Sequence, residues 1–196
     1  MIWGVGTGRC GTKSLAKELG GVHEPEPWYT DEPKTRWLTG VESYTLKEMI
    51  KYKAQLDTPI VVDFKSSYMI GLILRVDPGA KFIWIIREPV QCIKSLLKGK
   101  WHGDTDNQGE NLLEPWMGWN RGVYDDSRFH KCCWYYHMVN EHIYRYKRYV
   151  SAVYFTEDLE VHENKYPADI TIDLTDIELD YIHKQCDSIY QKAREL

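Results

Sequence analysis

The chain alternates short apolar runs with longer segments in which apolar residues recur three and four positions apart. The short runs predict strands, at residues 2–5, 58–65, 81–86 and 151–155. The segments of helical period predict helices, at residues 12–19, 43–56, 67–79, 89–98, 129–150 and from residue 175 onward. Strands and helices that alternate in this way are typical of a parallel sheet covered by helices. The pattern therefore predicts an α/β fold.

Individual residues mark the start of two of these helices. Pro89 follows the strand at 81–86 and suits the first turn of a helix, because the N–H that it lacks would have no helical partner there. Thr175 and Glu178 have the spacing of a capping box, in which each side chain binds the other residue's backbone N–H. We expect helices to begin at both places.

Two segments do not favour regular structure. Proline and acidic residues crowd residues 23–33, and glycine, asparagine and aspartate crowd residues 99–127. We expect an irregular connection at the first and a long loop, or lid, at the second. The sequence shows no internal repeat, low-complexity tract or linker. These features predict a single domain over residues 1–196.

Composition narrows the class of protein. The net charge of −4 and the pI near 6.0 do not suit a general nucleic-acid binder or a protein of the membrane surface, so any anion site must be local. No apolar run approaches the ~18 residues that cross a bilayer, and a strand that begins at residue 2 leaves no room for a signal peptide. The five cysteines are odd in number and lack a C-x-x-C spacing, which favours free thiols in a reducing cytoplasm.

The stretch "GVGTGRCGTKSL" at residues 4–15 combines a strand, a glycine-rich loop and the start of a helix. This arrangement presents backbone N–H groups and a helix N-terminus to a phosphate. A Walker loop would place lysine at position 12, but Thr12 stands there, Lys13 comes one place late and Arg9 lies inside the loop. We therefore expect anion binding with charge supplied from within the loop. The residues expected to bind the anion are Gly8, Arg9, Cys10, Gly11, Thr12, Lys13 and Ser14.

A second stretch, "REPVQCIKS", supplies another cationic group. Arg87 stands at the carboxyl end of a strand and Ser95 lies about two turns into the following helix, so both can reach one anion at the sheet edge. This predicts a second phosphate, away from the first. The strand that ends in Arg87 offers no ligand for magnesium, and Asp63 at the end of the other inner strand is followed closely by Lys65. The residues therefore favour a cation-lined site without a metal.

Taken together, these stretches resemble the sulfotransferase superfamily, whose members use 3′-phosphoadenosine 5′-phosphosulfate (PAPS). "GTGRCGTKSL" is similar to the family's 5′-phosphosulfate loop, and "IIREPVQCIKSLL" is similar to its 3′-phosphate motif. "VVDFKSSYM" is similar to the E-K-[ST]-P-x-Y stretch of heparan-type sulfotransferases, and "VYFTEDL" to the recurring Y-E-D-L. The four stretches follow the family's order over residues 2–159. The resemblance implies a three-layer αβα, P-loop nucleotide-hydrolase-like fold around a mainly parallel sheet.

The resemblance also implies a reaction and roles for residues. A sulfuryl group would pass in line from PAPS to a hydroxyl or amine of an acceptor, without metal, leaving 3′,5′-bisphosphoadenosine (PAP). Arg9 would stabilise charge on the departing oxygen. An arginine is a very poor proton donor, so Lys13 and Lys65 are alternatives for contacting that oxygen.

The base that activates the acceptor follows from position. Heparan-type relatives use a glutamate shortly after the first helix, and the corresponding stretch here offers His23, Glu24 and Glu26. Position favours Glu24, whereas His23 has the ordinary pKa closer to neutrality. Asp63 and Lys65 are expected to line the same cleft, and the choice of base stays open among His23, Glu24, Glu26 and Asp63.

The acceptor class and two other functions remain open. The heparan-like stretches suggest a saccharide, and tryptophans in or beside the long loop could close over it or merely anchor the loop; they are Trp101, Trp116 and Trp119. The histidines at 102, 130, 137 and 142 lack metal-ligand spacing, so we expect no metal. The alternatives to a sulfotransferase are a small-molecule or nucleotide kinase with a degenerate loop, and a non-catalytic nucleotide-binding module. The sequence does not indicate an oligomeric state.

Overall fold

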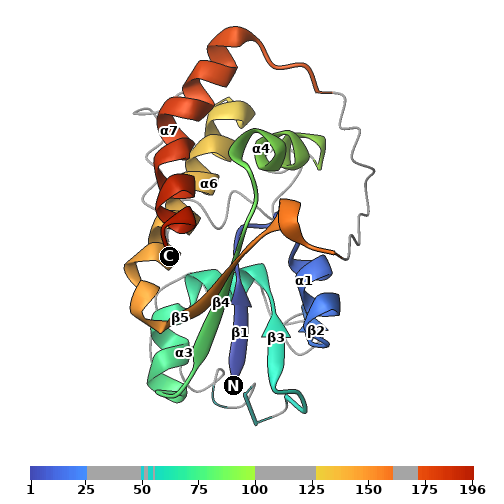
Figure 1. The fold of residues 1–196 in the computed structure, drawn as a ribbon, viewed down its shortest axis with the longest axis vertical. Helices are drawn as coiled ribbons and strands as arrows, with labels where there is room; N and C mark the ends of the chain where they lie inside the picture. The colour runs from blue at the N-terminus through green and yellow to red at the C-terminus, as the bar shows by residue number, and fades with distance from the viewer. Residues whose placement is uncertain (26–49, 51–52, 55, 100–126, 161–171) are drawn as a thin grey trace.

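A computed structural model describes residues 1–25, 50, 53–54, 56–99, 127–160 and 172–196. Within these ranges, five strands form one all-parallel sheet in the order β2-β3-β1-β4-β5 (Figure 1). The strands are β1 Ile2–Val5, β2 Val22–His23, β3 Ile60–Val62, β4 Lys81–Ile86 and β5 Val150–Phe155. The predicted α/β class with a parallel sheet is confirmed.

The described helices flank this sheet. They are α1 Thr12–Glu18, α3 Ile70–Val76, α4 Pro89–Lys98, α6 Arg128–Arg145 and α7 Asp176–Arg194. The described residues also contain three short 3₁₀ helices, η3 Phe64–Tyr68, η4 Lys147–Tyr149 and η5 Thr156–Asp158. Helix α1 packs against β1, β2 and β3, whereas α4, α6 and α7 pack against one another (Figure 1). The arrangement is compatible with three αβα layers.

The best-marked elements agree with the sequence. Strand β4 and helix α4 have the predicted bounds, and Pro89 occupies the first turn of α4. The Glu88 side chain caps this helix by accepting hydrogen bonds from the N–H groups of Val90 and Gln91. Thr175 and Glu178 form the predicted capping box at the start of α7.

Several boundaries differ from the prediction for identifiable reasons. The strand predicted over 58–65 is reduced to Ile60–Val62, because the Asp63 side chain accepts the N–H of Lys65 and turns the chain into η3. Helix α3 begins at Ile70, later than predicted. The helical pattern predicted to run to residue 150 ends at Arg145 in the structure, and Val150 already belongs to β5. The short strand β2 was not predicted, and its last residue, His23, is the first residue of the segment where the sequence favoured an irregular connection.

Some predictions fall on segments beyond the described residues. The predicted helix at 43–56 and the long loop at 99–127 lie almost wholly outside them, as do Glu26 and the loop tryptophans Trp101, Trp116 and Trp119. These remain predictions.

The core contains buried side chains of strands β1, β3 and β4 and of helices α1, α3, α4, α6 and α7. Trp3 on β1 and Trp84 on β4 are almost fully buried, and the Trp84 Nε1–H donates to Asn140 Oδ1 on α6 at 3.1 Å. All five cysteines are buried free thiols, as the absence of a disulfide pattern indicated. None of the helices in the described ranges has the length and apolar character needed to cross a membrane.

Candidate functional site

The glycine loop leaves β1 at the carboxyl edge of the sheet, and buried side chains hold its inner side. The N–H of Gly6 donates to Ser67 Oγ at 2.7 Å, and the Ser67 hydroxyl donates back to the Gly6 carbonyl at 2.7 Å. The N–H of Gly8 donates to the Tyr135 hydroxyl at 2.9 Å. A Cβ on Gly6 would lie 2.4 Å from the Ile85 carbonyl oxygen, so only glycine fits there. The core therefore sets the shape of the loop.

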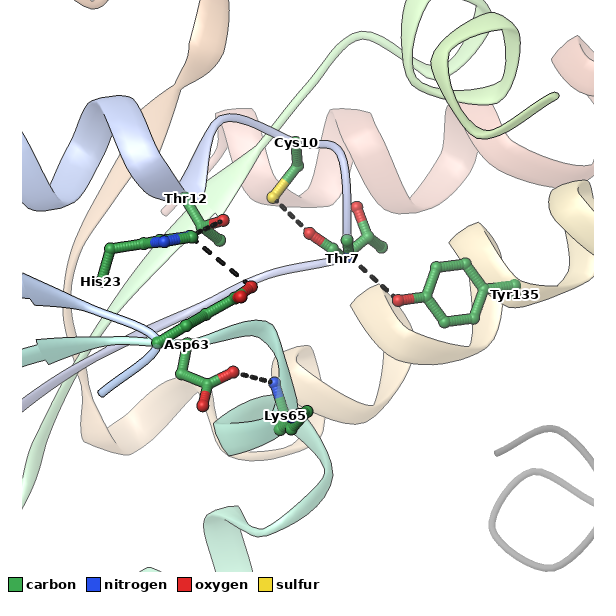
Figure 2. A network of polar contacts seen from close by, with 9 residues as sticks. Thr7, Cys10, Thr12, His23, Asp63, Lys65 and Tyr135 are labelled. Atoms are coloured by element: carbon green, nitrogen blue, oxygen red, sulfur yellow. Dashed lines mark hydrogen bonds and ion pairs between the residues drawn. The ribbon is translucent and has the colours of Figure 1, made fainter. Parts of the chain in front are cut away.

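These contacts limit what the loop can offer an anion. The N–H of Gly8 already has an inward partner in Tyr135, although the sequence predicted Gly8 as an anion ligand. The fully buried Cys10 thiol donates to the Thr7 carbonyl at 2.7 Å, as Figure 2 shows, and the Thr156 hydroxyl donates to the Cys10 carbonyl. Cys10 can therefore contact a ligand only through its N–H.

Two residues that the sequence singled out have strained backbones. Among the residues that the structure describes, the non-glycine positions with positive φ are Arg9, at 67°, and Glu24, at 45°. Conformations of this kind cost on the order of 1–3 kcal/mol each and cluster at functional sites. The loop cation and the predicted base thus share a feature that the sequence pattern could not show.

The cationic groups of the two sequence motifs meet at the loop. Arg9 Nε donates to Ser95 Oγ on α4 at 3.2 Å, across 86 residues of sequence. Arg87 Nη1 donates to the Arg9 carbonyl at 3.3 Å, and the Tyr136 hydroxyl fixes the strand end by donating to the Arg87 carbonyl. Arg9, Arg87 and Ser95 therefore form one cluster, which we call the arginine cluster. That it binds a second, separate phosphate stays a prediction.

On the other side of the loop, His23 connects α1 to the predicted base. His23 Nε2 lies 3.1 Å from Thr12 Oγ1 (Figure 2). It also lies 3.6 Å from Glu24 Oε1. Burial lowers the pKa of His23, the Glu24 carboxylate raises it, and Lys13 lowers it again; the net direction is downward. His23 is therefore mainly neutral at pH 7 and can accept or relay a proton.

Asp63 and Lys65 stand at the end of the neighbouring strand. Asp63 is fully buried, and its Oδ1 accepts the N–H of Lys65 at 2.9 Å. Its Oδ2 is buried without a hydrogen-bond partner in the described part of the chain. Burial raises the pKa of Asp63 to about 7, partly offset by the Lys65 N–H and ammonium and reinforced by the Glu24 charge. Asp63, an alternative base in the sequence, is thus a buried carboxyl of the site whose pKa is raised toward neutrality.

The remaining residues predicted to bind the anion differ in their exposure to solvent. Thr12 and Ser14 are buried in the first turn of α1, whereas Lys13 is exposed to solvent. Within the described ranges, no three His, Cys, Asp or Glu side chains gather in a way that could hold a metal ion.

The sequence missed the residues that support the loop from below. Ser67 and Tyr135 contact the loop across 61 and 127 residues of sequence. Ser67 lies in the quoted stretch "VVDFKSSYM", so a signal for it was present, whereas no local pattern marks Tyr135. Thr156, which binds the Cys10 carbonyl, begins the "TEDL" stretch that resembles Y-E-D-L, so a signal for it was present.

Neither the known protein families nor the curated proteins supply a relative of this chain. A scan against protein-family models finds no match to the chain, and a search of the curated proteins finds none either. The function is therefore argued from the geometry of the site and from the resemblance of its motifs.

Proposed function

We propose that this protein transfers a sulfuryl group from PAPS to a hydroxyl or amine of an acceptor, with a saccharide as the suggested class. The observation that carries the proposal is the arginine cluster beside the glycine loop. Two guanidinium groups and a serine hydroxyl gather where the carboxyl ends of β1 and β4 meet, the edge at which open α/β sheets bind ligands. Such a site suits a ligand with two separate anionic groups.

The proposal assigns the two ends of PAPS to the two halves of this site. The loop and the first turn of α1 would hold the 5′-phosphosulfate through backbone N–H groups and the Thr12 and Ser14 hydroxyls. Arg87 and Ser95 would hold the 3′-phosphate. Arg9 now donates to Ser95 and would exchange that partner for an oxygen of the ligand.

The chemistry then needs an acceptor base and a stabilised leaving group. The acceptor oxygen or nitrogen attacks sulfur, the bond from sulfur to the bridging oxygen breaks, and negative charge develops on the 5′-phosphate of PAP. The Arg9 guanidinium would stabilise this charge without donating a proton. The acceptor's proton would pass to Glu24, whose carboxylate lies 3.6 Å from the mainly neutral His23.

Two features argue against a magnesium-dependent kinase. Thr12 occupies the position of the Walker lysine. Asp63 directly follows β3, the strand beside β1, and such enzymes hold their metal at this place. Here the Asp63 side chain accepts the N–H of Lys65, and the nearby Lys65 ammonium acts to lower the pKa of Asp63. A divalent cation there would be opposed by this positive charge.

A thermal-shift comparison tests the proposal. We expect PAP to raise the melting temperature and ATP with magnesium to leave it nearly unchanged, because the site supplies fixed cations for two separated anionic groups. Stabilisation by ATP with magnesium and none by PAP would instead favour the kinase.

A further inference from the structure

Asp63 is fully buried beside the candidate site, and its cap alone does not explain why a carboxyl stands at this position. One carboxyl oxygen caps η3, and the other is buried with no hydrogen-bond partner in the described chain. A neutral asparagine would provide the same cap through its amide oxygen. A buried carboxyl whose charged form is poorly stabilised, next to a proposed active site, is a candidate for a functional role.

The neighbours of Asp63 identify that role. In the parallel register His23 pairs with Val62, so the next residues, Glu24 and Asp63, follow the two strands side by side. The Glu24 N–H donates to the Val62 carbonyl at 3.0 Å, which keeps this registration at the strand ends. Among the described residues, the charged groups that act on Asp63 are Glu24 from the β2 side and the Lys65 ammonium from η3. Burial raises the pKa of Tyr68, also from η3, and the nearby Tyr135 and the Asp63 charge raise it further.

Lys65 depends on Asp63 in two ways. The hydrogen bond from the Lys65 N–H to Asp63 Oδ1 turns the chain out of β3 and places Lys65 at the sheet edge. The Asp63 carboxylate also attracts the Lys65 ammonium, which lowers the pKa of Asp63. Protonation of Asp63 weakens the first interaction and removes the charge that drives the second.

We propose that Asp63 is a positioning residue, whose ionised carboxylate holds Lys65 toward the transferring group and whose protonation releases it. The proposal rests on the proposed function only where Lys65 acts on the sulfuryl group. The dependence of Lys65 on Asp63 rests on the hydrogen bond from the Lys65 N–H to the Asp63 carboxylate and does not need that function.

The placement of Lys65 should depend on pH. Because burial raises the pKa of Asp63 to about 7, its carboxylate is neutralised as the pH falls through neutrality. Among the described residues, His23 is another titratable group close to this carboxyl, and its pKa is lowered from 6.5, away from the transition expected near 7. Lys65 should therefore be well placed above pH 7 and released below it.

The first test follows the Lys65 backbone amide by two-dimensional NMR of the ¹⁵N-labelled protein between pH 5.5 and 8.5. We expect its proton shift to titrate with a midpoint near 7 in the wild type, and to show no such transition in Asp63→Asn. Asp57→Asn, which removes an exposed carboxylate before the same strand, is the matched control and should behave as the wild type. A midpoint near 4 in the wild type, or an unchanged transition in Asp63→Asn, would overturn the proposal.

The second test measures sulfuryl transfer from PAPS as a function of pH. We expect kcat of the wild type to fall below pH 7, and kcat of Asp63→Asn to be about tenfold to hundredfold lower at pH 8 without that acid limb. The acceptor KM should change less than kcat, since Lys65 acts in the transition state. A variant with the kcat and acid limb of the wild type would show that Asp63 has only its capping role. If PAP fails to bind, the proposed function fails, whereas the NMR titration still decides the Asp63–Lys65 dependence.

Discussion

Replacing Asp63 by asparagine should change how the stability of the protein depends on pH. The pKa of this carboxyl is raised from 3.8 to about 7 in the folded protein, first of all by burial. The folded state therefore keeps a proton that the unfolded state has lost. The stabilisation from that proton is fully present below pH 3.8 and is lost as the pH rises through about 7. The Asp63 carboxyl thus carries a cost in stability that grows with pH, and Asp63→Asn removes that cost.

The magnitude follows from the shift. One pKa unit is worth about 1.4 kcal/mol. The cost of the Asp63 charge grows by about this amount for each pH unit between pH 5 and pH 7 and then levels off. The total change between pH 5 and pH 8 is therefore roughly 2.5 kcal/mol. In the variant, the NH₂ group of asparagine would be buried without a hydrogen-bond partner, which costs about 1–3 kcal/mol. This cost does not vary with pH. The prediction therefore concerns the pH dependence of the difference in free energy of unfolding, and not its absolute value.

Urea unfolding followed by tryptophan fluorescence at several pH values measures this difference. The free energy of unfolding of Asp63→Asn should gain roughly 2.5 kcal/mol relative to the wild type on going from pH 5 to pH 8. Asp57→Asn should track the wild type, because Asp57 is exposed. Parallel curves for the wild type and Asp63→Asn would refute the assignment of a raised pKa to Asp63.

Three further predictions concern the loop, the thiols and the base. Tyr135→Phe leaves the Gly8 N–H buried without its acceptor and should lower the free energy of unfolding by about 1–3 kcal/mol, measured by urea unfolding, with an unchanged value counting against the role of this hydroxyl. All five thiols are buried, and burial raises the pKa of Cys92 to about 11 and that of Cys132 to about 12. A thiol reagent at pH 8 should therefore label the cysteines only after denaturation, and fast labelling of the native protein would contradict this. Glu24→Gln should abolish most sulfuryl transfer while PAP binding persists, and equal activity in the variant would exclude Glu24 as the base.

The sequence could predict elements that are marked by nearby residues. It could also predict arrangements that follow from a general rule of sheet topology. Strand β4 and helix α4 are marked by a continuous apolar run and by Pro89 at the first turn. Arg9 and Arg87 follow strands that are parallel neighbours, so their common place at the carboxyl edge follows from topology.

What the sequence could not predict depends on contacts between distant segments or on competition at one residue. Strand β3 ends early because the Asp63 side chain competes with the strand ladder for the Lys65 N–H. Tyr135 turns the Gly8 N–H inward from helix α6, which no pattern in the loop itself reveals. The positive φ of Glu24 likewise arises at a strand end fixed by its neighbour β3.

The central claim is that Arg87 and Ser95 of the arginine cluster bind the 3′-phosphate of a nucleotide whose 5′ group lies on the loop. Calorimetric titration of the wild type and Arg87→Ala with PAP and with adenosine 5′-phosphate tests it most directly, with Arg75→Ala on α3 as an exposed control. We predict that Arg87→Ala weakens PAP binding by about tenfold to hundredfold and adenosine 5′-phosphate binding very little, since a charge-assisted hydrogen bond is worth about 1.5–3 kcal/mol. Equal losses for the two ligands, or no binding of PAP by the wild type, would contradict the account.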